Sequence, residues 1–227
     1  MDDAVTDLAE LLERIGRGRS LPAAGAVTLL PAPAGRAVAA VLGCTAHHLI
    51  AADVDPQWLN SQLGDSEMTR PMKPDFLGVL GEHLDAKPGG QDTLLVTARP
   101  GVHSGTVQMA VATNPAALNH PRVDRALRYR DEVTVATVPG GLVTLGRGLA
   151  GRWEISIEVE PAYRGAGIGR TLAEQGSALA PPDALLWAQV HPANVASMRA
   201  FLAAGYRPVG AEVLFTREPD AATRCPR

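Results

Sequence analysis

The sequence predicts an α+β fold, and three observations support it. Short strand-like runs at 132–138, 141–147 and 153–160 follow one another closely, with turn residues between them, which is typical of a β-meander. Other segments, such as 3–15, carry apolar residues at helical spacing. Glycine (23) and proline (18) together make up about 18% of the 227 residues, against an average near 12%, which favours many short elements joined by tight loops.

The pattern of residues in the N-terminal part of the chain predicts short helices and strands. Gly16 and Gly18 end the first helix, and a turn rich in proline and alanine separates the next two strands. Asp55 is suited to cap a helix that has Pro56 in its first turn. The expected elements are helices over 3–15, 56–63 and 74–84, and strands over 26–30, 37–42, 47–52, 93–97 and, more weakly, 105–112.

Glycine and proline residues also mark the ends of the C-terminal elements. Pro139-Gly140-Gly141 supplies one turn of the meander, and Pro181-Pro182 stops a helix. The expected elements are a basic helix over 121–129, the three meander strands, a helix over 168–179, a strand over 184–190, a helix over 193–204 and a strand over 208–215. The polar tail 218–227 is expected to be disordered.

Composition excludes several classes of protein. The net charge of −3 and the pI of about 6.1 argue against a nucleic-acid-binding surface over the whole chain. No run of 18 apolar residues is present, so no membrane helix is expected. Two distant cysteines and an acidic N-terminus without a signal pattern favour a cytoplasmic protein. Adjacent His47 and His48 would point to opposite faces of a strand, so no metal site is expected.

A glycine-rich loop joins the strand 153–160 directly to the next helix. The N–H groups at a helix start lack intrahelical partners, and the helix dipole adds positive charge there. Gly165, Gly167 and Gly169 would let this backbone approach an anion closely. Their spacing fits neither a P-loop, which also needs a lysine, nor the dinucleotide-binding fingerprint. The loop therefore predicts a phosphate cradle, with an ordinary tight turn as the alternative.

This loop also resembles a known family. Arg164-x-x-Gly167-x-Gly169 is similar to the acyl-CoA loop Arg/Gln-x-x-Gly-x-Gly/Ala of the GCN5-related N-acetyltransferase (GNAT) family. Further similarities follow in the family's order: the strand 155–161, Asn194 and Ser197 at a helix start, Phe201, and Gly205-Tyr206. The resemblance covers about residues 130–216. It implies a mixed, mostly antiparallel central sheet flanked by helices, with an N-terminal α/β extension.

The resemblance implies acetyl-CoA as cosubstrate and a primary amine as acceptor, reacting by direct attack in a ternary complex. The Val159 main chain would pair with the pantetheine arm, where the strands 153–160 and 184–190 splay apart. Asn194 and Ser197 would line the CoA side of the site. The implied pyrophosphate-binding residues are Arg164, Gly165, Ala166, Gly167, Ile168, Gly169 and Arg170.

A base must take a proton from the amine. In the strand 153–160, isoleucine and valine alternate with Glu154, Ser156, Glu158 and Glu160. A row of carboxylates is costly to bury unless it lines a cavity, so an acceptor pocket floored by Glu154 and Glu158 is one interpretation. A solvated face of the meander is the other. Of the two candidate catalytic residues, Glu158 is preferred and Glu154 is second.

The chain departs from the family's pattern at Phe201. Much of the family has a tyrosine there, which protonates the leaving thiolate, and phenylalanine has no proton to give. The alternative to an N-acetyltransferase is therefore an acyl-CoA-binding sensor or partner-binding protein without turnover. A purely structural module is a third option.

The chain is expected to divide into three parts. These are an N-terminal α/β region over 1–115, an acetyl-CoA-binding core over 116–217, and the tail 218–227. The N-terminal region would build part of the acceptor site or a homodimer surface. The acceptor would be a small-molecule or peptide amine.

Overall fold

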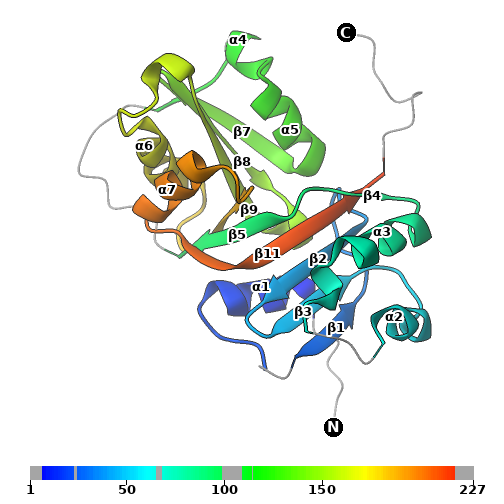
Figure 1. The fold of residues 1–227 in the computed structure, drawn as a ribbon. Helices are drawn as coiled ribbons and strands as arrows, with labels where there is room; N and C mark the ends of the chain where they lie inside the picture. Colours follow the sequence, from blue (N-terminus) through cyan, green and yellow to red (C-terminus); the bar gives the residue numbers. More distant parts are fainter. Residues whose placement is uncertain (1–6, 23–24, 65–67, 99–108, 114, 218–227) are drawn as a thin grey trace.

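The computed structural model describes residues 7–22, 25–64, 68–98, 109–113 and 115–217. Within these residues, eleven strands form one mixed sheet in the order β1-β3-β2-β11-β5-β10-β9-β8-β7-β6, with β4 paired to β11 (Figure 1). The strands are β1 (Ala26–Leu30), β2 (Ala39–Cys44), β3 (His47–Ala51), β4 (Lys87–Pro88), β5 (Asp92–Thr97), β6 (Ala110–Val111), β7 (Asp131–Val138), β8 (Gly141–Arg147), β9 (Trp153–Val159), β10 (Leu186–Val190) and β11 (Arg207–Thr216). The α-helices are α1 (Leu8–Gly16), α2 (Pro56–Leu63), α3 (Pro74–His83), α4 (Pro115–Leu118), α5 (Pro121–Tyr129), α6 (Ile168–Gln175) and α7 (Val195–Ala203). The prediction of an α+β fold with a mixed, mostly antiparallel sheet is confirmed.

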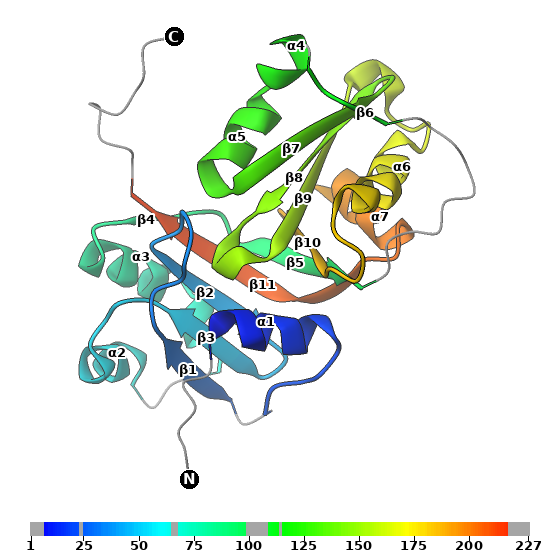
Figure 2. The same ribbon diagram turned by 180° about the vertical axis from the view of Figure 1, so that it is seen from behind.

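Helices cover both faces of the N-terminal strands. Successive residues of a strand point to opposite faces of the sheet, so neighbours in β2 enter different cores. Leu42 belongs to the apolar cluster that contains Leu12 of α1, whereas Val41 belongs to the cluster that contains Phe76 of α3. The view from behind shows α1 lying across the strands on the side away from α2 and α3 (Figure 2).

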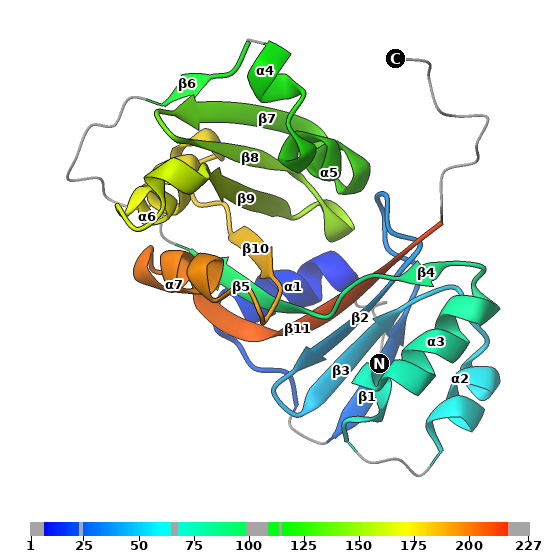
Figure 3. The same ribbon diagram turned by 45° about the horizontal axis from the view of Figure 1, so that its top comes forward.

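The C-terminal strands are likewise covered on both faces. Strands β7, β8 and β9 form the predicted antiparallel meander. Ile155 and Ile157 of β9 pack in one cluster with Leu172 of α6 and Phe201 of α7. Helix α5 lies on the opposite face (Figure 3), the face that the acidic side chains of β9 share.

Strand β11 joins the two halves of the sheet. It pairs antiparallel with β2 along one edge and with β5 along the other, and β5 pairs in turn with β10. Strand β5 precedes the expected boundary at residue 115, yet it lies between two strands of the C-terminal part. The sheet is therefore continuous across that boundary, and the division into domains stays a prediction.

Most predicted elements occur within a few residues of their expected bounds. The helix expected over 168–179 is α-helical only to Gln175 and continues as a 3-10 turn over Gly176–Leu179. A Cβ at Gly176 would lie 2.7 Å from Ile155 Cδ1, so glycine lets this turn approach the sheet. Only 110–111 of the strand expected over 105–112 is a described strand, since 105–108 lie outside the described residues, as do 3–6 and the tail 218–227. None of the described helices is both long and apolar enough to cross a membrane.

Candidate functional site

Strands β9 and β10 are parallel neighbours that separate toward their C-terminal ends. They pair at Leu186↔Trp153 and Trp187↔Glu154, and the described chain has no further pair between them, although β9 runs on to Val159 and β10 to Val190. The facing backbone groups beyond these pairs are therefore available to a third, extended chain. The structure thus has the splay between these two strands that the sequence analysis expects.

A cavity of about 630 Å³ lies at this opening. Pockets that hold small molecules usually measure roughly 300–1,000 Å³, so the cavity is large enough for a ligand. Its walls come from β9 (156–158), the end of β10 (189–191), the start of α5 (120–122), and Asn194, Ser197 and Phe201. We call this cavity the cleft.

Glu158 lines the cleft, as the sequence predicts. Its Oε2 accepts hydrogen bonds from Arg122 Nη2 at 2.7 Å and Arg122 Nε at 3.2 Å. Arg164 Nη2 lies 3.9 Å from Glu158 Oε1. The His120 ring caps α5 by accepting from the Arg122 backbone N–H, which fixes the start of this helix beside β9. With 29% of its side chain exposed, Glu158 is reachable from the cleft.

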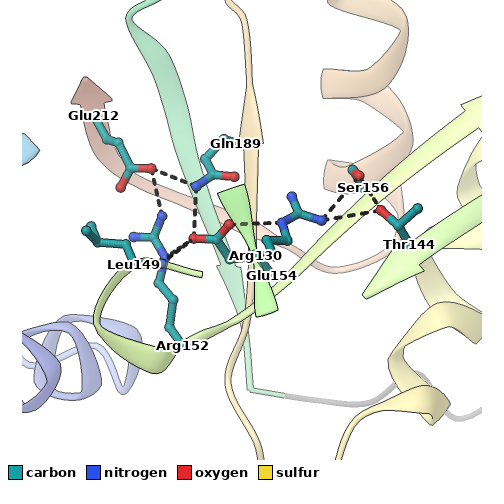
Figure 4. Close-up of polar contacts among 8 residues, drawn as sticks. All are labelled: Arg130, Thr144, Leu149, Arg152, Glu154, Ser156, Gln189 and Glu212. Carbon is teal, nitrogen blue, oxygen red and sulfur yellow. Dashed lines mark hydrogen bonds and ion pairs between the residues drawn. The ribbon is translucent and has the colours of Figure 1, made fainter. Parts of the chain in front are cut away.

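Glu154 lies on the same side of β9 but in a closed environment (Figure 4), and the residue is 1% exposed. Its Oε2 accepts from Arg130 Nε at 3.1 Å. Its Oε1 accepts from Arg152 Nε at 2.8 Å, Gln189 Nε2 at 3.0 Å and the Leu149 backbone N–H at 3.2 Å. Both carboxylate oxygens are therefore engaged by buried donors.

A second buried glutamate completes this network (Figure 4). Arg152 Nη2 and Gln189 Nε2 each donate to Glu212 Oε1 at 2.7 Å. Arg130 also donates to the hydroxyls of Thr144 and Ser156, both at 3.3 Å. We call Arg130, Arg152, Glu154, Gln189 and Glu212 the buried network. Its two guanidinium groups balance its two carboxylates, which is how buried charges are tolerated.

This environment argues against Glu154 as a candidate base. Burial alone would raise the pKa of its carboxyl, but the charges and hydrogen bonds of Arg152 and Arg130 hold the pKa below its ordinary value. A carboxylate with a lowered pKa is a weaker proton acceptor. The sequence expectation that Glu154 floors an open pocket therefore gives way to a structural role, because two arginines enclose its side chain.

The sequence analysis singled out none of Arg152, Gln189 and Glu212. A signal was present, because Gln189 and Glu212 interrupt otherwise apolar strand patterns. An isolated polar side chain in such a pattern needs a buried partner. Strand spacing alone does not identify that partner, since Glu212 lies 60 positions from Arg152 in the chain.

The glycine loop lies at the exposed start of α6. Gly165 and Gly167 have φ values of +84° and +82°, in the left-handed region that favours glycine. Gly167 is the N-cap of α6, and among the described residues no side chain caps this helix end. A Cβ at either glycine would meet no atom within 4 Å, so the space in front of the loop is open. The first N–H groups of α6 accordingly receive no side-chain cap in the described structure, as an anion site requires.

The third glycine has a packing role. A Cβ at Gly169 would lie 3.3 Å from Ala200 Cβ of α7 and 3.6 Å from Val159 Cγ2. Gly169 therefore lets α6 pack closely on α7 and on the end of β9, which sets the position of the loop. Ile168 is half-buried and packs on the cluster around Ile157.

The polar side chains predicted to bind CoA have local partners. Arg164 Nε donates to the Val159 carbonyl at 3.3 Å, and Arg170 pairs with Glu174 at 2.6 Å. Both arginines are exposed. Ala166 is exposed within the same loop. Arg164 thus lies beside the backbone that the sequence analysis assigns to the pantetheine arm.

Asn194 and Ser197 lie together at the start of α7. The Asn194 side chain accepts from the Ser197 backbone N–H at 3.1 Å and so caps the helix. Both residues line the cleft, as do Glu158 and Arg122. The cap explains locally why an asparagine begins this helix.

Phe201 is buried and lines the cleft. Its ring meets Tyr206 edge-on, with centroids 4.9 Å apart. Burial raises the pKa of the Tyr206 phenol. Its hydroxyl has no hydrogen-bond partner among the described residues, so Tyr206 is part of the core and not a proton donor to the cleft.

His47 is likewise a structural residue. Its ring is hydrogen-bonded to Thr28 Oγ1 at 2.8 Å and to the Pro22 carbonyl at 3.1 Å. Across the described ranges, no group of three or more metal-binding side chains is arranged to hold an ion.

Comparison with known proteins was made for both sequence and structure. Residues 119–206 match the family model described as Acetyltransferase (GNAT) family. No curated protein matches the sequence. Among solved structures, a GNAT-family protein from Novosphingobium aromaticivorans is 15% identical with a TM-score of 0.42, covering 59% of this chain and 66% of that one. A GCN5-related N-acetyltransferase from Kribbella flavida is 16% identical with a TM-score of 0.41, covering 64% and 65%.

An acetyltransferase from the GNAT family from Colwellia psychrerythraea is 13% identical with a TM-score of 0.39, covering 63% of this chain and 62% of that one. The chain thus spans slightly less than two thirds of each of these structures. The likeness to the family rests on the sequence match, which begins just before α5 and ends at Tyr206. Residues 119–206 therefore resemble an acetyltransferase domain of the GNAT family.

Proposed function

We propose that this protein transfers an acetyl group from acetyl-CoA to a primary amine of a small molecule or peptide. The observation that supports this most directly is the splay of β9 and β10, which opens beside the uncapped start of α6. An extended arm can lie in the first feature while a diphosphate is held by the second.

The residues fit such a ligand in two ways. At Gly165 and Gly167 a Cβ would project into open space, so the backbone can approach a bulky anion. The Val159 carbonyl lies at the open end of the splay, where Arg164 already donates to it. Arg164 and Arg170 supply positive charge next to the loop, and Asn194 and Ser197 line the cleft.

Glu158 is the side chain proposed to take the amine proton, directly or through one water molecule. Arg122 and Arg164 hold its carboxylate in the cleft. Acetyl-CoA supplies an activated thioester carbon that the amine nitrogen attacks, and the CoA thiolate leaves. Phe201 offers no proton, so the thiolate takes its proton from solvent.

The test is CoA release measured over a panel of amines. Glu158→Gln keeps the size of the side chain but removes the proton acceptor, so turnover should fall about 10²-fold or more. Glu160→Gln is the matched control, because this exposed residue lies outside the cleft. An unchanged rate for Glu158→Gln at every pH would remove Glu158 from the mechanism.

A second candidate function is an acyl-CoA-binding sensor without turnover. Phe201 favours it, because the cleft then lacks the proton donor that the resemblance leads one to expect. Calorimetry with acetyl-CoA separates the two, since a sensor binds acetyl-CoA but releases no CoA with any amine.

A further inference from the structure

A small pocket of about 70 Å³ lies next to the cleft. Asp92, Arg122, Ser156 and Gln189 line both cavities, so the pocket and the cleft are direct neighbours. We call it the inner pocket. Its far side is formed by Glu154, Glu212 and Leu214, and α5 covers it through Arg125, Ala126, Tyr129 and Arg130.

Among the described residues, three carboxyl groups and three arginines line the inner pocket: Asp92, Glu154 and Glu212, and Arg122, Arg125 and Arg130. Arg122 Nη2 donates a hydrogen bond to Glu158 Oε2 at 2.7 Å. Arg130 is committed to Glu154, and Arg152 is shared between Glu154 and Glu212. Asp92, which is half-buried, is not hydrogen-bonded to any of these arginines in the described part of the chain.

One carboxylate oxygen of Glu212 lacks a hydrogen-bond partner in the part of the chain that the structure describes. The residue is 1% exposed and lines the inner pocket. Its Oε1 accepts from Arg152 and Gln189, whereas its Oε2 has no hydrogen-bond partner among the described residues. A buried carboxylate oxygen without a donor is costly, so a ligand with an N–H group would gain by reaching it.

Asp92 is the second acceptor in this pocket. It is half-buried, and it lies opposite Glu212 in the pairing of β5 with β11. Neither a hydrogen bond nor an ion pair joins its carboxyl group to another described residue. Burial, and then the charge of Glu212, raise its pKa, while Arg125 and His191 act in the opposite direction. A cation placed here would be attracted to both carboxyl groups.

Arg125 also lines the pocket, and its charge lowers the pKa of Asp92 against the larger effect of burial. Its side chain is exposed and its guanidinium carbon lies 5.2 Å from the centre of the Tyr129 ring. A ligand carboxylate could meet Arg125 at the rim, but deeper in the pocket it would face the unpaired oxygen of Glu212. The inner end therefore favours a cation over an anion.

We propose that the inner pocket receives a second, cationic nitrogen of the acceptor, while the nitrogen to be acetylated stays in the cleft beside Glu158. The acceptor would then be a diamine or a similar molecule with two basic nitrogens. This inference rests on the proposed acetyl transfer. The pocket has room for about an ammonium group and its first carbon, given that one water occupies roughly 30 Å³.

The test compares α,ω-diamines with n-alkylamines of the same chain length as acceptors. Wild-type protein should favour the diamine in kcat/KM by at least tenfold at the best length, because a hydrogen bond to a charged group is worth about one to two factors of ten. In Asp92→Asn and Glu212→Gln this preference should fall at least tenfold. Asp124→Asn, which removes a charge from the exposed side of α5, should leave it unchanged.

Binding is measured alongside turnover, by calorimetry with each amine in the presence of CoA. Glu212→Gln disturbs the buried network, so thermal unfolding checks that the variant folds, and Asp92→Asn tests the pocket if it does not. Equal binding of diamine and monoamine by wild-type protein would overturn the inference even if acetyl transfer is observed. Tighter diamine binding without CoA release would uphold the pocket and refute the proposed function.

Discussion

In the Glu154→Gln variant, an amide of nearly the same volume replaces a buried carboxylate. The carboxylate accepts hydrogen bonds at one oxygen from Arg130 and at the other from Arg152, Gln189 and Leu149. Glutamine has one oxygen and one NH₂ group, so its NH₂ group must face a donor on one side. One arginine loses its charge partner without gaining access to water.

The magnitude follows from this burial. Removing one partner of a buried ion pair costs about 3–5 kcal/mol, and the side chains of Glu154 and Arg152 are only 2% and 4% exposed. A domain is typically stable by about 5–15 kcal/mol, so the variant should lose about a fifth or more of its free energy of unfolding. For a chain of 227 residues, the melting temperature should fall by roughly 6–20 °C.

Urea unfolding at pH 7 measures this loss, with Glu158→Gln as the control. The side chains of Glu158 and Arg122 are 29% and 28% exposed, and a solvent-accessible pair contributes only about 0–1 kcal/mol. Glu154→Gln should therefore lower stability while Glu158→Gln lowers activity. A loss below about 1 kcal/mol in Glu154→Gln would refute the reasoning, because it would mean that the buried network does not stabilise the fold.

The effect also has a pH dependence with a definite sign. The pKa of Glu154 in the folded protein lies below its ordinary value. Its stabilising contribution is therefore present above the unfolded-state pKa, roughly 4.3, and is lost as the pH falls through the folded-state pKa. The stability difference between wild type and Glu154→Gln should narrow on acidification and not on alkalinisation.

Two further predictions concern the Tyr206 hydroxyl and the Asp92 carboxyl group, whose burial costs free energy of folding. Tyr206→Phe removes a buried hydroxyl without a described partner, so stability should be unchanged or higher in urea unfolding, and a loss above about 1 kcal/mol would reveal a hydrogen bond to that hydroxyl. The pKa of Asp92 is raised, so stability falls as pH rises from the unfolded-state to the folded-state pKa. Asp92→Asn should accordingly match wild type in melting temperature at pH 3 and equal or exceed it at pH 7, and a lower melting temperature at pH 7 alone would contradict the direction of this shift.

The local pattern of the sequence predicts the faces of the strand 153–160 and the helix after the glycine loop well. Alternation in the strand 153–160 places Ile155 and Ile157 in the core beneath α6, with Glu154 and Glu158 on the other face, and the structure confirms both. The glycine loop leads into a helix as expected. Its two positions in the left-handed backbone region, 165 and 167, are both glycines. These features depend only on strand periodicity and on backbone freedom, which are local properties.

The arrangement of the whole sheet could not be predicted in the same way. Strand β5 lies between β10 and β11, and β11 continues into the N-terminal strands through β2. Such pairings join residues far apart in the chain, and nothing in the strand sequences identifies their neighbours. The different environments of Glu154 and Glu158 have the same origin, because Arg130, Arg152 and Gln189 are hydrogen-bonded to the former and not, in the described structure, to the latter.

The measurement that tests the central claim most directly is a calorimetric titration of acetyl-CoA into wild type, Gly167→Asp and Gly167→Asn. Aspartate and asparagine have nearly the same shape and tolerate the positive φ of +82° at this position, so they differ mainly in charge. We predict one-to-one binding by wild type, binding at least tenfold weaker in Gly167→Asp, and Gly167→Asn within a few-fold of wild type. Absence of binding to wild type, or equal affinity in Gly167→Asp, would contradict the claim that the start of α6 holds the diphosphate.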